Sequence, residues 1–194
     1  MTRAHRADPD RRRLLGAGLA AAALAAAAPL APARAADPAD VIDLRVDHSI
    51  DDLMSSVNGA RELMSRAKGV LVMPAITKAG LLVGGMYGEG ALRIGGQSVG
   101  YYSVGAASIG LQAGVQKFDQ ALFFMTTSAL ENFRRSSGWE LAADAEVTAM
   151  NNNLAGTVTS RTTQHPVIAV IYGQEGLMAG VSLEGAKYTK LKER

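Results

Sequence analysis

The clearest helical pattern in the chain lies just after residue 40, where apolar side chains recur every three or four residues between charged ones. This spacing predicts an amphipathic helix over about 40–57. Asn58-Gly59 breaks the pattern, and a short second helix is predicted over 60–67. A capping pair formed by Ser49 and Asp52 is an alternative start for the first helix. The apolar positions are Ile42, Val46, Ile50, Leu53, Met54 and Val57.

From Gly69 onward the pattern changes to short apolar runs broken by glycine, which is typical of β-strands. Val70–Met73 is the first such run, and we expect Pro74 to end it. Gly95-Gly96 is expected to form a hairpin turn. One further helix is predicted over 128–135, with Ser128 as its cap and Glu131 at the third position. Residues 80–94 are predicted to form a strand, a Gly-rich bend and a second strand. The other strands are predicted at 98–104, 107–115, 121–126, 140–150, 157–161, 167–172, 176–183 and 186–191.

These elements predict an α+β fold. Its core is a Gly-rich curled antiparallel sheet or a barrel-like β core, with N-terminal amphipathic helices and one further helix. The helices occupy 40–67 and the β-rich core 69–191 of a single domain, 36–194. The 21 glycines of the chain are explained by tight bends, bulges or close backbone approach as a small sheet closes.

The N-terminus has the layout of an export signal. Arg11-Arg12-Arg13 precedes an Ala/Leu/Gly-rich run over 14–30, and Ala33-Arg34-Ala35 has the small residues that a signal peptidase accepts. We expect cleavage after Ala35, so that Ala36 starts the mature chain. Adjacent arginines before a weakly apolar run favour the twin-arginine route over a Sec signal. Both routes predict export to the periplasm or beyond, and the run is shorter than the roughly 20 residues of a spanning helix.

Charge and cysteine content exclude several classes of protein. The whole chain has 20 basic and 18 acidic residues. Loss of residues 1–35, which hold six arginines and two aspartates, leaves 14 basic and 16 acidic residues, a net charge of −2. This charge argues against a nucleic-acid partner. The absence of cysteine excludes disulfides, thiolate metal sites and a lipidated cysteine.

The sequence contains no recognisable catalytic motif. His48 and His165 lack a second ligand at metal-binding spacing. Ser108 lies in Ala-Ala-Ser-Ile-Gly, which lacks the first glycine of G-x-S-x-G. The Gly-rich stretch 84–90 lacks the ending of a phosphate loop and is expected to be a bent hairpin. We therefore expect no enzyme activity and no cofactor. A hydrolase remains the weaker alternative, because five carboxylates can still meet in space: Glu89, Asp119, Asp144, Glu175 and Glu184.

Basic residues gather around the second predicted helix. Arg61, Arg66, Lys68 and Lys78 are candidates for a lipid-binding patch, because basic residues beside an apolar helix face can dock at a headgroup boundary. In the competing interpretation the apolar face packs on the sheet, which periodicity alone favours. The apolar residues concerned are Leu53, Met54, Val57, Leu63 and Met64.

Several short motifs, taken in order, resemble the SYLF domain family, also described as a DUF500-type lipid-binding or yeast actin-binding domain. The resemblance covers about residues 59–188. It is carried by Ala67-Lys68-Gly69-Val70 running to Pro74, Lys78-Ala79-Gly80, Gly84-Gly85 with Gly88-x-Gly90, Tyr102-Ser103, Gly110-x-Gln112-x-Gly114, Asp119, Phe133 and Gly176–Gly185.

The resemblance implies a lipid-binding module. Eukaryotic members bind phosphoinositides through a basic, amphipathic N-terminal region, and some fungal members also bind actin filaments. Lys68 and Lys78 match basic positions of the family pattern, whereas Arg61 and Arg66 are inferred from the helix. Tyr101–Val104 stands where the eukaryotic pattern has Trp-Ser-x-Pro.

The function predicted from the sequence is that of an exported domain that associates with anionic phospholipid in the cell envelope. The alternative is an envelope protein-protein interaction module without a lipid ligand. The expected partners are therefore a phospholipid membrane surface or envelope proteins, and no nucleic acid. The oligomeric state is left open.

Overall fold

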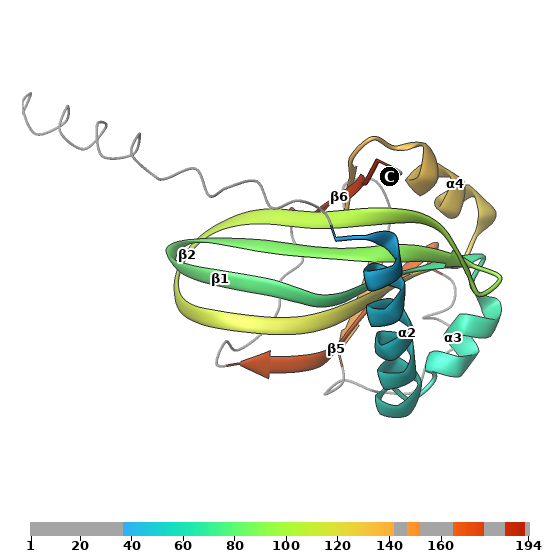
Figure 1. The fold of residues 1–194 in the computed structure, drawn as a ribbon, viewed down its shortest axis with the longest axis horizontal. Helices are drawn as coiled ribbons and strands as arrows, with labels where there is room; N and C mark the ends of the chain where they lie inside the picture. The colour runs from blue at the N-terminus through green and yellow to red at the C-terminus, as the bar shows by residue number, and fades with distance from the viewer. Residues whose placement is uncertain (1–36, 142–146, 152–164, 177–184, 193–194) are drawn as a thin grey trace, which may run out of the picture. The chain divides into compact units, whose positions relative to one another are not determined.

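The computed structural model describes residues 37–141, 147–151, 165–176 and 185–192 (Figure 1). The predicted signal with its cleavage site at Ala35-Ala36 lies outside the described residues. So do the predicted strand at 157–161, nearly all of that at 176–183, and the carboxylates Asp144 and Glu184. Residues 36–194 form one compact unit. Both hydrophobic clusters described below lie within this unit, so it can be studied by itself.

Three helices and six strands make up the described part of the chain. The helices are α2 (Ala39–Ser56), α3 (Ala60–Arg66) and α4 (Thr127–Arg135). The strands are β1 (Gly69–Ile94), β2 (Gln97–Phe124), β3 (Trp139–Glu140), β4 (Val147–Asn151), β5 (Val167–Gly176) and β6 (Lys187–Lys190). Two helices thus precede the sheet and one interrupts it, as the sequence predicts.

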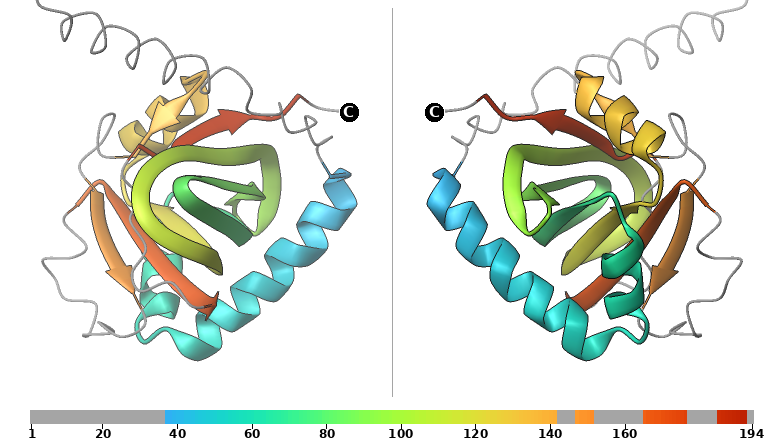
Figure 2. Two further views of the ribbon diagram at one scale, coloured as in Figure 1. Left: turned by 90° about the vertical axis from the view of Figure 1, so that its left-hand side faces the viewer. Right: turned by 90° about the vertical axis from the view of Figure 1, so that its right-hand side faces the viewer.

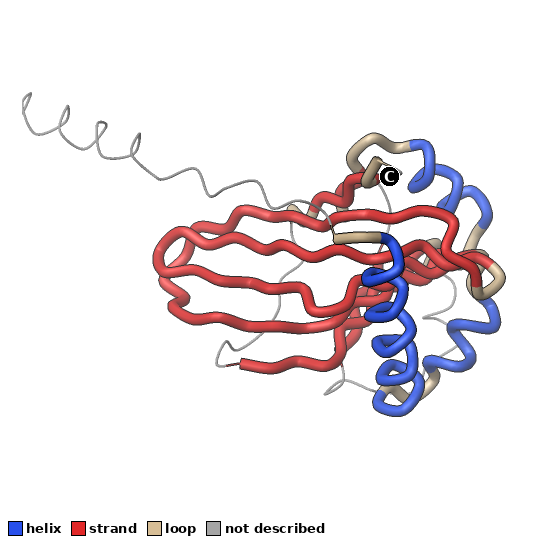
Figure 3. The backbone as a smooth tube through the Cα atoms, in the orientation of Figure 1, coloured by secondary structure: helices blue, strands red, loops and turns tan. Residues whose placement is uncertain are grey.

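Two long strands form the centre of the sheet. β1 and β2 are antiparallel partners from Gly69 opposite Phe124 to Ile94 opposite Gln97. Gly95 and Gly96 join them with φ values of 58° and 83°, the left-handed conformation that a tight hairpin turn needs. The predicted turn is confirmed. Seen end-on in Figure 2, β2 curves around β1, and Figure 3 shows both strands turning back on themselves.

Several predicted strand ends are wrong. Pro74 does not end a strand, because β1 continues past it through a register shift between Met73 and Ile76. Proline is tolerated at such a bulge, where the missing N–H leaves no ladder bond unmade. The segments predicted at 98–104, 107–115 and 121–126 belong to one strand, β2, which ends at Phe124 and pairs with β1 along most of its length, with register shifts. The bent hairpin expected over 84–90 is also wrong, because these residues lie within β1 and pair without a break with 102–108 of β2.

The remaining strands extend the sheet on both sides of β2. The order is β3-β6-β2-β5-β4, with β1 also paired to β2. All described pairs are antiparallel except β4 with β5. The curled sheet predicted from the sequence is confirmed, and the parallel pair is the exception. The fifteen residues 152–166 between β4 and β5 are long enough for the crossover that a parallel pair requires.

Alternate residues of the strands pack into two hydrophobic clusters, because successive side chains point to opposite faces of a sheet. Leu71 and Leu122 belong to the cluster that α4 covers. Val72 and Phe123 belong to the cluster under α2 and α3. The first cluster is rich in aromatic rings: Tyr102, Phe118, Phe124, Phe133, Trp139 and Tyr188.

Two predicted helix starts are corrected. α4 is capped by Thr126, whose Oγ1 accepts the N–H of Ala129 at 3.2 Å, and Ser128 lies inside the helix. Thr126 has the extended backbone of a cap residue. The alternative start of the first helix at Ser49 is also wrong, since α2 begins at Ala39 and Ser49 is buried in its middle.

None of the described helices has the length and apolar character that crossing a bilayer would require. In the same part of the chain, no group of three or more His, Asp or Glu side chains is arranged to hold a metal ion. His48 is exposed and lies 3.6 Å from Asp52.

Candidate functional site

A mainly apolar hollow of about 350 Å³ opens where α2 and α3 meet the start of β1 and the Gly95-Gly96 turn. We call it the helix-side hollow. Three half-buried apolar side chains, Ile50, Met54 and Met64, line it beside the buried face of the helices. Its other lining residues are Asp47, Ala67, Lys68, Gly69, Val70, Arg93, Gly95 and Gly96.

The two cations of the helix-side hollow differ in their partners. The guanidinium of Arg93 lies 2.5 Å from the Asp47 carboxylate and 3.5 Å from that of Asp43, so its charge is compensated and it ties α2 to β1. Lys68 makes no ion pair with any residue that the structure describes, and its side chain is exposed. Lys68 is therefore the cation available at the edge of this apolar surface.

The structure gathers three of the four basic residues singled out in the sequence. Arg61 and Arg66 are exposed on α3, and Lys68 follows two residues later. Arg66 is paired with Glu62 at 3.0 Å. Lys78 lies apart from them, opposite Gln116, after ten further residues of chain. At the usual rise of a strand this is about 30 Å along β1.

The apolar residues considered for lipid docking divide into two groups. Leu53, Val57 and Leu63 are buried in the cluster between the helices and the sheet. For these three, packing on the sheet is confirmed. Met54 and Met64 are only partly buried and line the helix-side hollow. Of the apolar residues considered for lipid docking, these two are therefore the ones accessible to a ligand.

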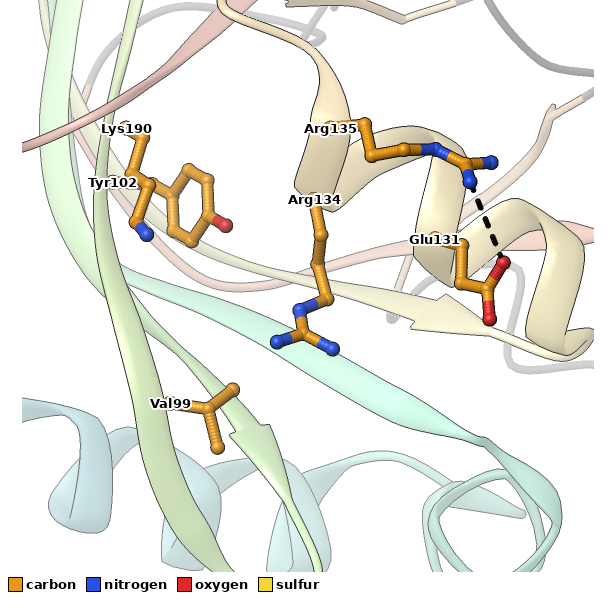
Figure 4. Close-up of a pocket in the computed structure, with 6 residues that line it drawn as sticks. All are labelled: Val99, Tyr102, Glu131, Arg134, Arg135 and Lys190. Atoms are coloured by element: carbon orange, nitrogen blue, oxygen red, sulfur yellow. Dashed lines mark ion pairs between the residues drawn. The ribbon is translucent and has the colours of Figure 1, made fainter.

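Sequence reasoning missed a second, more polar hollow of about 250 Å³ beside α4 (Figure 4). We call it the α4 hollow. Its side chains come from α4, from β2 and from β6: Val99, Tyr102, Glu131, Arg134, Arg135 and Lys190. The adjacent Arg134 and Arg135 in the last turn of a predicted helix were a usable signal. Lys190 was not, because only the pairing of β6 with β2 brings it there.

Two of the carboxylates considered for catalysis have structural partners. Asp119 accepts a hydrogen bond from the Ser49 hydroxyl at 2.5 Å and another from the N–H of Ala75 at 2.8 Å. Glu89 accepts the N–H of Asp37 at 2.8 Å and the hydroxyl of Tyr87. Asp119 thus connects α2 to the sheet, and Glu89 connects the segment before α2 to the sheet. Both carboxylates therefore have structural roles. Glu175 is exposed on β5.

Residues 105–194 match the family described as Ysc84, Las17-binding protein actin regulator. The matched segment, slightly less than half of the chain, is thus similar to the SYLF family. This finding confirms the resemblance that the sequence motifs indicate. The match to the SYLF family begins within β2 and includes α4 and β3 to β6, so Arg134, Arg135 and Lys190 lie inside it, whereas Lys68 precedes it. The comparison with curated proteins finds no match.

Proposed function

We propose that this protein is an exported, non-catalytic SYLF domain that binds anionic phospholipid at a membrane of the cell envelope. The observation that carries the proposal is the helix-side hollow, in which the half-buried Met54 and Met64 lie beside Lys68, a lysine without an ion pair to any described residue. An apolar surface with a cation at its edge matches the boundary between acyl chains and phosphates in a bilayer.

The parts of the helix-side hollow suit different parts of the lipid. Its methionines contact acyl chains near the membrane surface, because their flexible thioether side chains adapt to irregular apolar partners. Lys68 in the hollow and the exposed Arg61 on the neighbouring α3 approach the phosphates. Each basic residue near an anionic surface contributes about 1 kcal/mol, so the binding is weak and decreases with salt.

Export is supported by the order of features at the N-terminus. Arg11-Arg12-Arg13, the apolar run over 14–30 and Ala33-Arg34-Ala35 follow one another as in a secretory signal. An exported protein meets phospholipid at the outer side of the inner membrane. This placement also makes cytoskeletal actin an unsuitable partner for the chain.

A protein partner is the second candidate. The family description names a protein that its members bind, and on this basis the same hollow can hold an apolar segment of an envelope protein. Such binding requires no anionic lipid. It therefore predicts that vesicles of any composition leave the protein unbound.

The proposal is tested by vesicle binding of residues 36–194 and of two matched variants. Arg61→Gln with Lys68→Gln removes two contacts of about 1 kcal/mol each, so we expect roughly thirtyfold weaker binding to phosphatidylglycerol vesicles. Lys78→Gln is the control, because this lysine lies far from α3 along β1. Unchanged binding of the double variant would contradict the proposal.

A further inference from the structure

The α4 hollow holds an excess of positive charge in a small space. Three cations, Arg134, Arg135 and Lys190, line it against one carboxylate, Glu131. The carboxylate is used by Arg135, whose Nη1 lies 3.8 Å from Glu131 Oε2. Among the described residues, Arg134 and Lys190 make no ion pair. Two positive charges without a counter-ion among the described residues therefore line the hollow.

The side chains that line the α4 hollow point in different directions. In Figure 4 the guanidinium of Arg134 extends from the helix toward the strand side, where the hydroxyl of Tyr102 faces it, while Arg135 turns along α4 toward Glu131. A Cβ placed on Gly100 would lie 3.6 Å from both Lys190 Cε and the Tyr102 hydroxyl oxygen. Lys190 and Tyr102 thus approach the same point.

Tyr102 adds a fixed hydrogen-bond donor. Its side chain is only 3% exposed and packs against Phe133, with ring centroids 4.7 Å apart. Its hydroxyl has no hydrogen-bond partner within the part of the chain that the structure describes. Burial raises the pKa of Tyr102, and the charge of Arg134 lowers it only in part. The hydroxyl therefore stays protonated at neutral pH and can donate.

We propose that the α4 hollow binds a phosphate monoester, with Arg134 and Lys190 compensating its two negative charges and the Tyr102 hydroxyl donating to one of its oxygens. The guanidinium matches phosphate because it presents several donors in one plane. A monoester carries a charge of about −1.5 to −2 at pH 7, which fits two uncompensated cations. A carboxylate or a phosphodiester carries only one negative charge.

The size of the hollow limits the ligand to a small group. Its volume of about 250 Å³ is below the roughly 300 to 1,000 Å³ of sites that enclose a drug-sized molecule. A phosphate group with a few attached atoms fits this space. The group can be the headgroup of a phosphatidic acid in a membrane or the phosphate of a soluble monoester, and both present the same chemistry to the protein.

The soluble source is tested by calorimetric titration of residues 36–194 with glycerol 3-phosphate. We expect binding that strengthens as pH rises through about 6, where the second phosphate proton dissociates. Arg134→Gln and Lys190→Gln are each expected to weaken it tenfold or more, and Tyr102→Phe several-fold. Lys117→Gln is the matched control, because this exposed lysine lies outside the α4 hollow. Thermal unfolding of each variant verifies that the fold is retained.

The lipid source is tested with vesicles that contain phosphatidic acid or phosphatidylglycerol at equal surface charge. A preference for phosphatidic acid that Arg134→Gln abolishes supports the site in a lipid-binding role. Binding of glycerol 3-phosphate without that preference supports the site with a soluble ligand. Binding of neither ligand, or equal affinity of parent and Arg134→Gln for both, overturns the proposal. The Arg61 and Lys68 variants are expected to retain glycerol 3-phosphate binding, so this result is independent of the helix-side hollow.

Discussion

The hydroxyl of Ser49 on α2 donates a hydrogen bond of 2.5 Å to the carboxylate of Asp119 on β2. The same hydroxyl oxygen lies 2.7 Å from the hydroxyl of Tyr172. Because a serine has one proton and Asp119 receives it, Tyr172 donates to Ser49. The other oxygen of Asp119 accepts the N–H of Ala75, which has a positive φ of 50° at the β1 bulge. One carboxylate therefore joins the first helix to an irregular point of the sheet.

Ser49→Ala is expected to lower the free energy of unfolding by about 1–3 kcal/mol, because it leaves the buried Tyr172 hydroxyl without its partner and removes one of the two hydrogen bonds to Asp119. Urea denaturation followed by the fluorescence of Trp139, the one tryptophan of the chain, measures the change. Ser55→Ala is the control, since this exposed serine bonds only to the Asp52 carbonyl of its own helix. Equal losses for the two variants would contradict the role assigned to Ser49.

Two glycines of β1 are expected to tolerate alanine to different extents. A Cβ on Gly90 would lie 2.0 Å from the carbonyl oxygen of Val72, which is backbone and cannot move aside. A Cβ on Gly85 would meet only the carbonyl oxygen of Ala106, at 3.6 Å. We expect Gly90→Ala to destabilise the protein by about 3 kcal/mol or more and Gly85→Ala by less than about 1 kcal/mol. Thermal denaturation of the two variants compares them directly, and similar melting temperatures would refute the close approach of β1 to itself.

The raised pKa values of two buried tyrosines predict that the protein loses stability at high pH. Burial raises the pKa of Tyr172 and Tyr188 well above the usual value near 10, and their hydrogen bonds to Ser49 and Gln120 lower it only in part. The folded state thus favours the neutral phenols. Their contribution is complete below about pH 10, the pKa in the unfolded chain, and is lost progressively above it.

Urea denaturation between pH 8 and pH 11.5 tests this dependence. The free energy of unfolding is expected to fall above pH 10, with a smaller slope in Tyr188→Phe, which removes one of the two phenols. An unchanged slope in that variant would show that Tyr188 ionises in the folded state.

Substitution of Met64 allows lipid binding to be tested separately from folding. It lines the helix-side hollow and is only partly buried, whereas its neighbour Leu63 is fully buried. Met64→Gln is expected to weaken binding to anionic vesicles several-fold while the melting temperature changes little, because partial burial of a methionine contributes about 1 kcal/mol. Leu63→Gln is expected to unfold the domain. Vesicle flotation and thermal denaturation of both variants measure the two effects, and undiminished flotation of Met64→Gln would remove this residue from the docking surface.

Local patterns in the sequence predict most of the elements. The three described helices, the Gly95-Gly96 turn and the curled sheet all follow from periodicity and turn chemistry. The strand ends do not follow from them. Pro74 reads locally as a stop, but whether a strand continues past a proline depends on the partner strand, here through the bond from Ala75 N–H to Asp119. The parallel pairing of β4 with β5 likewise depends on tertiary structure and not on the local sequence pattern.

The residues of the two hollows also divide into those that the sequence brings together and those that only the tertiary structure brings together. Lys68 and the methionines at 54 and 64 are close in the chain, and the docking surface predicted from this closeness agrees with the hollow that all three line. The α4 hollow joins residues from positions 99 to 190, and strand pairing that sequence spacing does not encode brings them together. Lys78 was grouped with Lys68 by closeness in the chain, although an extended strand carries it away.

Flotation of residues 36–194 with anionic and with zwitterionic vesicles, at low and at physiological salt, tests the proposed lipid binding most directly. We expect binding to phosphatidylglycerol vesicles that weakens as salt is raised, and little binding to phosphatidylcholine vesicles. Absence of binding to either vesicle at low salt would contradict it and would favour the protein partner.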